Sequence, residues 1–133
     1  MAQPQQGPSG IEFLDYTPPR RFAAGARVGN IVYLSGETSR HPETGELVPG
    51  DIAAQTERVF QNIELSLRAF GTDLAHVFKI VVYLRDMDHL PVVSAARGRY
   101  FPRTVPSTTI AVSRLTLPEF LVEIDAMALV PDR

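Results

Sequence analysis

Two carboxylates, Glu123 and Asp125, lie two residues apart in an alternating segment near the end of the sequence. Because the side chains of a β-strand point alternately to its two faces, this spacing places both acids on one face. The alternation predicts one face with Leu121, Glu123, Asp125 and Met127, and another with Val122, Ile124, Ala126 and Ala128. Acids on such a partly apolar face can mark a functional site, or they can simply face water on an antiparallel sheet.

Other groups give weaker chemical signals. Residues 107–109 provide three hydroxyls, but no histidine lies near them in the sequence to act as base for a serine nucleophile. His41 follows Arg40 and could meet an anionic ligand, although a histidine in a loop is usually only exposed. A metal site is not indicated, because the three histidines are widely scattered: His41, His76 and His89.

The composition excludes several classes of function. The chain has no cysteine, so it can have neither disulfides nor a thiolate nucleophile, and a reducing compartment is expected. Its 13 basic and 15 acidic residues give a net charge of −2 without long runs of one sign, which argues against nucleic-acid binding. Glycine-rich phosphate-binding motifs are absent from the sequence, and we expect no cofactor.

The length of 133 residues fits one domain. Residues 1–10 are rich in Gln, Pro and Gly and predict a flexible tail, which leaves residues 11–133 as the domain. The longest apolar run, residues 80–84, is far shorter than the roughly 20 residues that cross a bilayer. The N-terminus lacks the pattern of a secretory signal, so we expect a cytoplasmic protein without membrane contact.

The elements that must position these groups follow from periodicity. Apolar residues at spacings of three and four predict a helix over residues 52–70, with Asp51 as N-cap and Gly71 as its end. Residues 77–84 are short and β-branched and predict a central strand, and residues 90–101 predict a second helix with Pro91 in its first turn.

Further strands are expected over residues 11–14, 22–28, 31–34, 108–112 and 121–130. Gly29-Asn30 predicts a tight turn that pairs the second and third of these as a hairpin. Because one apolar stripe on each helix needs a surface to cover it, the fold class is α+β, with two helices on one face of a mostly antiparallel sheet. We expect this domain to work as a small homo-oligomer.

Several segments together resemble the RidA/YjgF family, also called endoribonuclease L-PSP-like. They extend in the same order from about Arg20 onward: residues 28–36, 42–45, 55–56, 62–63, 77–79 and 121–128. The resemblance implies a chorismate-mutase-like fold, a homotrimer whose sheets form a central barrel, and clefts between subunits. Several members hydrolyse enamines and imines to a carbonyl compound and ammonia, whereas others have no established activity. Residues 35–42 are most similar to the branch that contains 2-aminomuconate deaminase.

The resemblance also implies roles for particular residues. Glu123 matches the glutamate of the family's cleft, which holds and activates the attacking water. The deaminases bind the substrate carboxylate with an arginine, but the register that keeps Thr108-Thr109 aligned places Ser107 at that position. A rival register would use Arg103, yet it leaves Pro106 inside a strand. Alternatively, Arg114 could reach the cleft.

At other positions of the family's cleft, this sequence has residues of different polarity. Phe22 stands where the family often has an aromatic hydroxyl, and Ser94 stands where it often has an amide. Ser35 and Gly36 are retained, and Gly36 lets backbone groups approach a ligand closely. The hydroxyls of Ser107 and Thr109, with the backbone at Gly36, are then expected to bind substrate.

Glu37 is an unusual carboxylate for the edge of this cleft. If Glu37 and Glu123 share a pocket, repulsion and burial would raise the pKa of one of them and place an acid beside a base. Alternatively, Glu37 points to solvent from a loop.

Two hypotheses follow for the function. The first is a cofactor-independent hydrolase for a small imine, enamine or related metabolite whose cleft offers only hydroxyls and acids, so that ordinary imino acids are poor substrates. The second is a trimer that binds a small molecule or a partner and has lost the reaction. Ribonuclease activity, attributed to some members of the family, is not supported, because the basic residues are not clustered.

Overall fold

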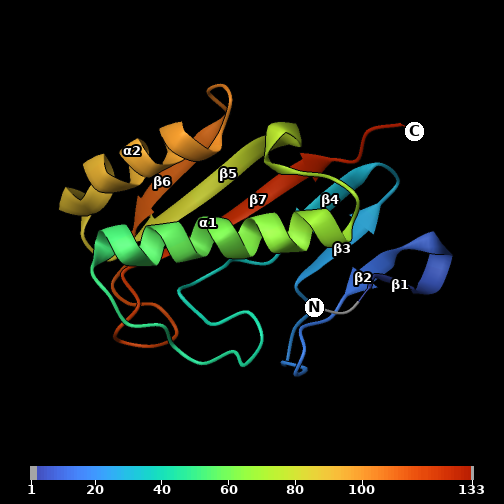
Figure 1. Cartoon of the computed structure of the whole chain (residues 1–133), viewed down its shortest axis with the longest axis horizontal. Helices are drawn as coiled ribbons and strands as arrows, with labels where there is room; N and C mark the ends of the chain where they lie inside the picture. Colours follow the sequence, from blue (N-terminus) through green and yellow to red (C-terminus); the bar gives the residue numbers. More distant parts are fainter. Residues whose placement is uncertain (1–2, 133) are drawn as a thin grey trace.

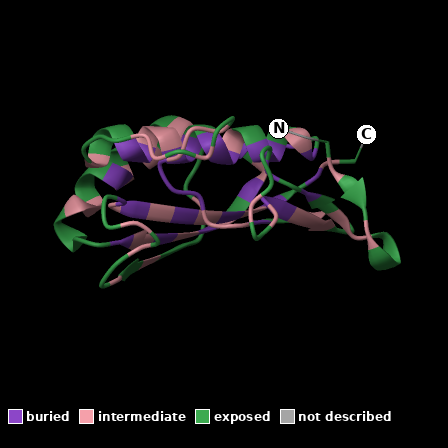
Figure 2. Ribbon diagram, turned by 90° about the horizontal axis from the view of Figure 1, so that it is seen from below, coloured by how far each residue is buried: buried purple, intermediate pink, exposed green. Residues whose placement is uncertain are grey.

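The computed structural model describes residues 3–132, which form one sheet covered on one face by two helices (Figures 1 and 2). The strands are β1 (Gln5–Gln6), β2 (Glu12–Leu14), β3 (Gly25–Val28), β4 (Ile31–Leu34), β5 (Val77–Leu84), β6 (Ser107–Ala111) and β7 (Val122–Leu129). The helices are α1 (Ile52–Ala69) and α2 (Leu90–Tyr100), with short 3-10 turns η1 (Pro8–Gly10), η2 (Leu74–His76) and η3 (Met87–His89).

The sheet has the strand order β1-β2-β3-β4-β7-β5-β6 within the described chain. Only the pair β5–β6 is parallel among the strand pairings of residues 3–132, because α2 crosses between these two strands. Strand β5 lies between β7 and β6, as expected for a central strand, and β6 forms one edge of the sheet. The predicted α+β class is therefore confirmed.

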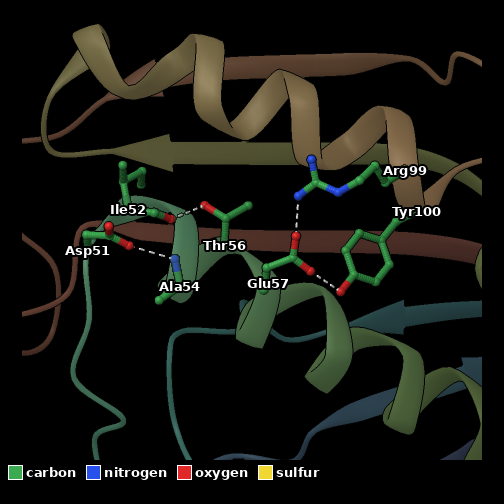
Figure 3. Close-up of polar contacts among 7 residues, drawn as sticks. All are labelled: Asp51, Ile52, Ala54, Thr56, Glu57, Arg99 and Tyr100. Carbon is green, nitrogen blue, oxygen red and sulfur yellow. Dashed lines mark hydrogen bonds and ion pairs between the residues drawn. The ribbon is translucent and has the colours of Figure 1, made fainter.

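Helix α1 is capped at both ends and bonded to α2, and Figure 3 shows its N-terminal cap and its contacts with α2. The carboxylate of Asp51 accepts a hydrogen bond of 2.9 Å from the backbone N–H of Ala54, so the predicted N-cap is confirmed. Gly71 follows the helix with φ at +81°, a conformation that glycine adopts without a steric penalty. Glu57 of α1 accepts hydrogen bonds from Arg99 and from the hydroxyl of Tyr100, which join the two helices.

The hydrophobic core lies between the helices and the sheet. The strand β7 shows the predicted alternation, with Val122, Ile124, Ala126 and Ala128 buried on the face toward the helices. The opposite face of the sheet is partly exposed, and we refer to it as the outer face. Large apolar side chains remain accessible on this outer face, among them Tyr33, Ile110 and Leu129.

The N-terminal segment differs from its prediction. The tail expected over residues 1–10 lies partly outside the described residues, but Gln5–Gln6 form β1 and pair with Glu12 and Phe13 of β2. The benzyl ring of Phe13 packs so closely on Gly7 that a Cβ atom there would lie 2.7 Å from it. Backbone pairing and this single ring contact thus extend the sheet into a segment whose composition predicted no structure.

Two further features bear on function. No helix in the described part of the chain combines the length and the apolar character that crossing a membrane requires. Nowhere in residues 3–132 do three His, Asp or Glu side chains gather as a metal ion would need.

Candidate functional site

Glu123 lies on the outer face of β7, where its carboxylate rests against Gly36. A Cβ atom on Gly36 would lie 2.4 Å from Oε2 of Glu123, so no larger residue could occupy position 36 without moving this carboxylate. Burial, followed by the negative charge of Asp125, raises the pKa of Glu123. A half-buried carboxylate with a raised pKa accepts a proton from water more readily than an exposed one.

Asp125 lies next to Glu123 on the outer face of β7. The hydroxyl of Tyr83 on β5 donates to Oδ2 of Asp125 at 3.3 Å, and burial raises the pKa of Asp125. Beyond it on the outer face, Nζ of Lys79 donates to the hydroxyl of Thr108 at 2.9 Å. Both acids of the alternating segment thus face the same side, as the sequence predicted, and Glu123 is the more buried of the two.

Glu37 is buried, with 3% of its surface exposed, so the alternative in which it points to solvent is wrong. Its backbone pairs with Ile124 through hydrogen bonds of 2.8 and 3.1 Å, and the hydroxyl of Tyr16 donates to its Oε1 at 2.9 Å. Burial raises the pKa of Glu37 to about 7, although Tyr16, Arg20 and a third group, Arg40, act in the opposite direction.

Glu37 and Glu123 do not share a pocket. Side chains alternate along paired strands, so Gly36 faces the side of Glu123, whereas Glu37 faces the buried side of Ile124. The negative charge of Glu123 still contributes to the raised pKa of Glu37. The predicted arrangement of acid beside base is therefore replaced by two carboxylates on opposite sides of the sheet.

A cavity of about 540 Å³ lies between α2 and β6. Ser94 and Ser107, which the sequence predicted as binding residues, both line it. Nη1 of Arg97 donates to Oγ of Ser107 at 2.9 Å, and Nη2 donates to Oγ of Ser94 at 3.4 Å. A guanidinium thus lies directly against the position that the resemblance assigned to an arginine. Arg103 lines the cavity as well.

The expectation that the cleft offers only hydroxyls and acids is therefore wrong, because a guanidinium contacts Ser107. Strand β6 begins at Ser107, directly after Pro106, which agrees with the register that placed serine rather than Arg103 at the key position. Sequence reasoning missed Arg97, although its spacing of three from Ser94 on a predicted helix gave the signal that both share one face. Arg114 is exposed beyond the end of β6 and is not among the residues that line the cavity.

The remaining predicted residues have other surroundings. The hydroxyl of Ser35 donates to the backbone oxygen of Ala23 at 2.7 Å, so it fixes the segment before β3. Phe22 is exposed and packs edge to face on Tyr16, with ring centroids 5.8 Å apart. Thr109 pairs with the buried residue Val82, so it points to the side of the helices, as Ser107 does.

One chain does not bring Glu123 and Arg97 together. Glu123 is level with Tyr83 of β5, whereas Ser107, the partner of Arg97, is level with Ile80. Strand spacing and rise place the Cα atoms of Glu123 and Ser107 roughly 14 Å apart. The side chains of Glu123 and Ser107 also point to opposite faces of the sheet, so a single copy keeps Glu123 and Arg97 apart.

Comparisons with known proteins agree with this geometry. The sequence profile described as Endoribonuclease L-PSP matches residues 15–130. A RutC family protein of Pyrococcus abyssi is 36% identical over 108 residues, covering 80% of this chain and 84% of that protein. A mouse 2-iminobutanoate/2-iminopropanoate deaminase is 31% identical, covering 80% of this chain and 79% of that protein. The crystal structure of RidA from an Antarctic Psychrobacter superposes with a TM-score of 0.78 at 30% identity, covering 86% of this chain and 93% of that one.

Proposed function

Since this chain belongs to the RidA/YjgF family, we propose that it hydrolyses a small imine or enamine that bears a carboxylate, releasing a carbonyl compound and ammonia. The observation on which this proposal rests is the hydrogen bond of 2.9 Å between Arg97 and Ser107. The guanidinium group of Arg97 is a planar, permanently charged double donor, and it lies at the position where the resemblance requires an arginine. The similarity of residues 35–42 to the branch that contains 2-aminomuconate deaminase stays a prediction.

Glu123 acts as the general base in this proposal. It takes a proton from water while the oxygen bonds to the imine carbon and the electrons of the C=N bond move to nitrogen. Glu123 passes this proton to the nitrogen, which gives a neutral carbinolamine. It then takes the proton of the carbinolamine hydroxyl as the C=O bond forms and the C–N bond breaks, and returns that proton to the nitrogen, which leaves as ammonia. Burial raises the pKa of Glu123 above its ordinary value, which suits a group that accepts a proton and then donates it in one reaction cycle. This cycle uses water alone, so no cofactor is needed.

The cleft is proposed to form between copies of a homotrimer. Glu123 and Arg97 lie on opposite sides of one sheet, so a second copy must supply one of them to a shared pocket. The outer face supports this assembly, because Tyr33, Ile110 and Leu129 each expose more than two fifths of their surface there. Burying this face against neighbouring copies would remove large apolar surface from water and bring Glu123 to an interface.

Mixed trimers test the reaction and the shared cleft together. Glu123→Gln and Arg97→Gln chains, each inactive or weak alone, would be refolded as a 1:1 mixture and assayed for ammonia release from 2-iminopropanoate generated in situ. If each cleft takes Glu123 from one copy and Arg97 from the next, about one quarter of the clefts regain both residues. Refolded wild type provides the reference, and each variant refolded alone provides the background.

The mixture separates the possible outcomes. Recovery of about a quarter of wild-type activity supports a cleft between copies, because a site within one chain would recover none. Absence of ammonia release by the wild type itself would contradict the deaminase proposal.

A second function is a trimer that binds a small molecule without turning it over. Two observations favour it: Phe22 lacks the hydroxyl donor, and the hydroxyl of Ser35 is already bonded to backbone. In that case the wild type would bind 2-oxobutanoate without releasing ammonia from imines. Glu123→Gln and Glu37→Gln would then leave this binding nearly unchanged, whereas loss of turnover in Glu123→Gln indicates the enzyme.

A further inference from the structure

A second cavity, of about 390 Å³, is lined by three arginines. Arg20 and Arg21 come from the segment before β3, and Arg40 comes from the loop after β4. The other residues around it are Pro18, Pro19, Phe22, Thr44 and Gly45. It shares no lining residue with the cavity beside Arg97, so the two cavities are distinct within one chain.

Two of the three guanidinium groups are held in place by aromatic rings. The guanidinium carbon of Arg20 lies 3.7 Å from the ring centre of Tyr16, and that of Arg40 lies 4.9 Å from the ring centre of Phe120. Nη1 of Arg40 also donates to the backbone oxygen of Gly45 at 2.9 Å. These contacts fix the orientation of both groups at the cavity before any ligand arrives, which lowers the entropic cost of binding.

The three arginines of this cavity are not compensated by direct ion pairs. Within residues 3–132, none of the three arginines forms an ion pair with a carboxylate. Burial, and after it the positive charge of Arg20, lowers the pKa of Arg40, while Tyr16 and Glu37 act in the opposite direction. The negative charge of Glu37 acts on Arg20 and Arg40, but Glu37 is buried and accepts a hydrogen bond from the hydroxyl of Tyr16.

We propose that Arg20, Arg21 and Arg40 bind the oxyanion, a carboxylate or a phosphate, of a small ligand. The guanidinium group offers donors in a fixed fork that matches both oxyanions, and an anion here would offset the like charges of Arg20 and Arg40. Pro18 and Pro19 restrict the backbone at the rim, so the cavity is largely formed in advance. This site extends the proposed function, because it needs neither Glu123 nor the reaction.

Calorimetric titration at pH 7 and low ionic strength tests the site, with inorganic phosphate in one arm and succinate in the other. Arg21→Gln is the main variant, because Arg21 is exposed and its removal spares the ring contacts of its neighbours. Arg40→Gln is a second variant, checked for folding by circular dichroism. Arg68→Gln is the control with the same charge change, since Arg68 is exposed on α1 and, within residues 3–132, forms an ion pair only with Glu64.

The expected result is saturable binding of at least one anion, weakened about tenfold by Arg21→Gln and unchanged by Arg68→Gln. The arm that binds more tightly identifies the oxyanion. Arg97→Gln should also leave the affinity unchanged, which separates this site from the proposed active site. Absence of saturable binding in both arms, equal weakening by Arg21→Gln and Arg68→Gln, or loss only in Arg97→Gln would overturn the proposal.

Discussion

Replacing Glu37 with glutamine should change how stability depends on pH. The folded chain raises the pKa of Glu37 from its ordinary value near 4.5 to about 7, chiefly by burial. The folded state therefore holds this proton in a range where the unfolded chain has already released it. The contribution of Glu37 to the free energy of unfolding is then fully present below pH 4.5 and is lost as pH rises through 7.

The size of this effect follows from the pKa difference. Each pKa unit corresponds to about 1.4 kcal/mol, so the wild type should lose about 3 kcal/mol between pH 4.5 and pH 8 relative to Glu37→Gln. Glutamine is neutral at every pH, and its Oε1 can still accept the hydrogen bond of Tyr16. The groups around position 37, Tyr16, Arg20, Arg40 and Glu123, are the same in both proteins, so their own titration largely cancels in the comparison.

Urea unfolding of both proteins at half-unit steps from pH 4.5 to 8 measures the difference. Glu43→Gln is a matched control, because Glu43 is exposed in the same loop and the charge change is identical. The variant should gain stability over the wild type with rising pH, while the control stays parallel to the wild type. A difference that is constant with pH, or that favours the wild type at pH 8, would refute the account of Glu37 as a proton-binding buried acid.

Three further substitutions test the site and its support. Gly36→Ala should lower kcat/KM for ammonia release about a hundredfold with little loss in a thermal melt, because the new methyl displaces the movable carboxylate of Glu123. Arg97→Gln should raise KM for 2-iminopropanoate at least tenfold, and Arg97→Lys should restore only part of it, since lysine lacks the fork. Gln55→Leu should cost about 3 kcal/mol in urea unfolding, because Gln55 bonds the backbone of Gly50, Glu119 and Leu121 and its loss leaves these groups without partners.

Local signals were sufficient to predict most of the backbone. Strand β5 has the bounds that its apolar, β-branched run predicted, and Asp51 and Gly71 delimit α1 because capping acts through neighbouring residues. The alternation of β7 correctly placed Glu123 and Asp125 on one face. These features depend on interactions within a few residues, which a sequence displays directly.

The surroundings of the site residues could not be predicted in the same way. The contact of Arg97 with Ser107 joins a helix to a strand edge, and it depends on how α2 packs rather than on any local pattern. Glu37 lies in a loop without periodicity, so nothing in the sequence indicated that Ile124 would pair with it and bury it. Sequence identified Ser107 as a departure from the family, but only packing shows that a guanidinium from another element lies beside it.

The pairing of Glu37 with Ile124 determines to which face of the sheet the carboxylates of Glu37 and Glu123 point. Because side chains alternate, this register places Gly36 beneath Glu123 on the outer face and turns Glu37 toward the hydroxyl of Tyr16. A shift by one residue would bring Glu37 against Glu123, where two acids repel, and would leave the buried hydroxyl of Tyr16 without its acceptor. Repulsion between the two acids and the hydrogen bond of Tyr16 therefore both favour the observed register. The separation of the two acids follows from this strand pairing.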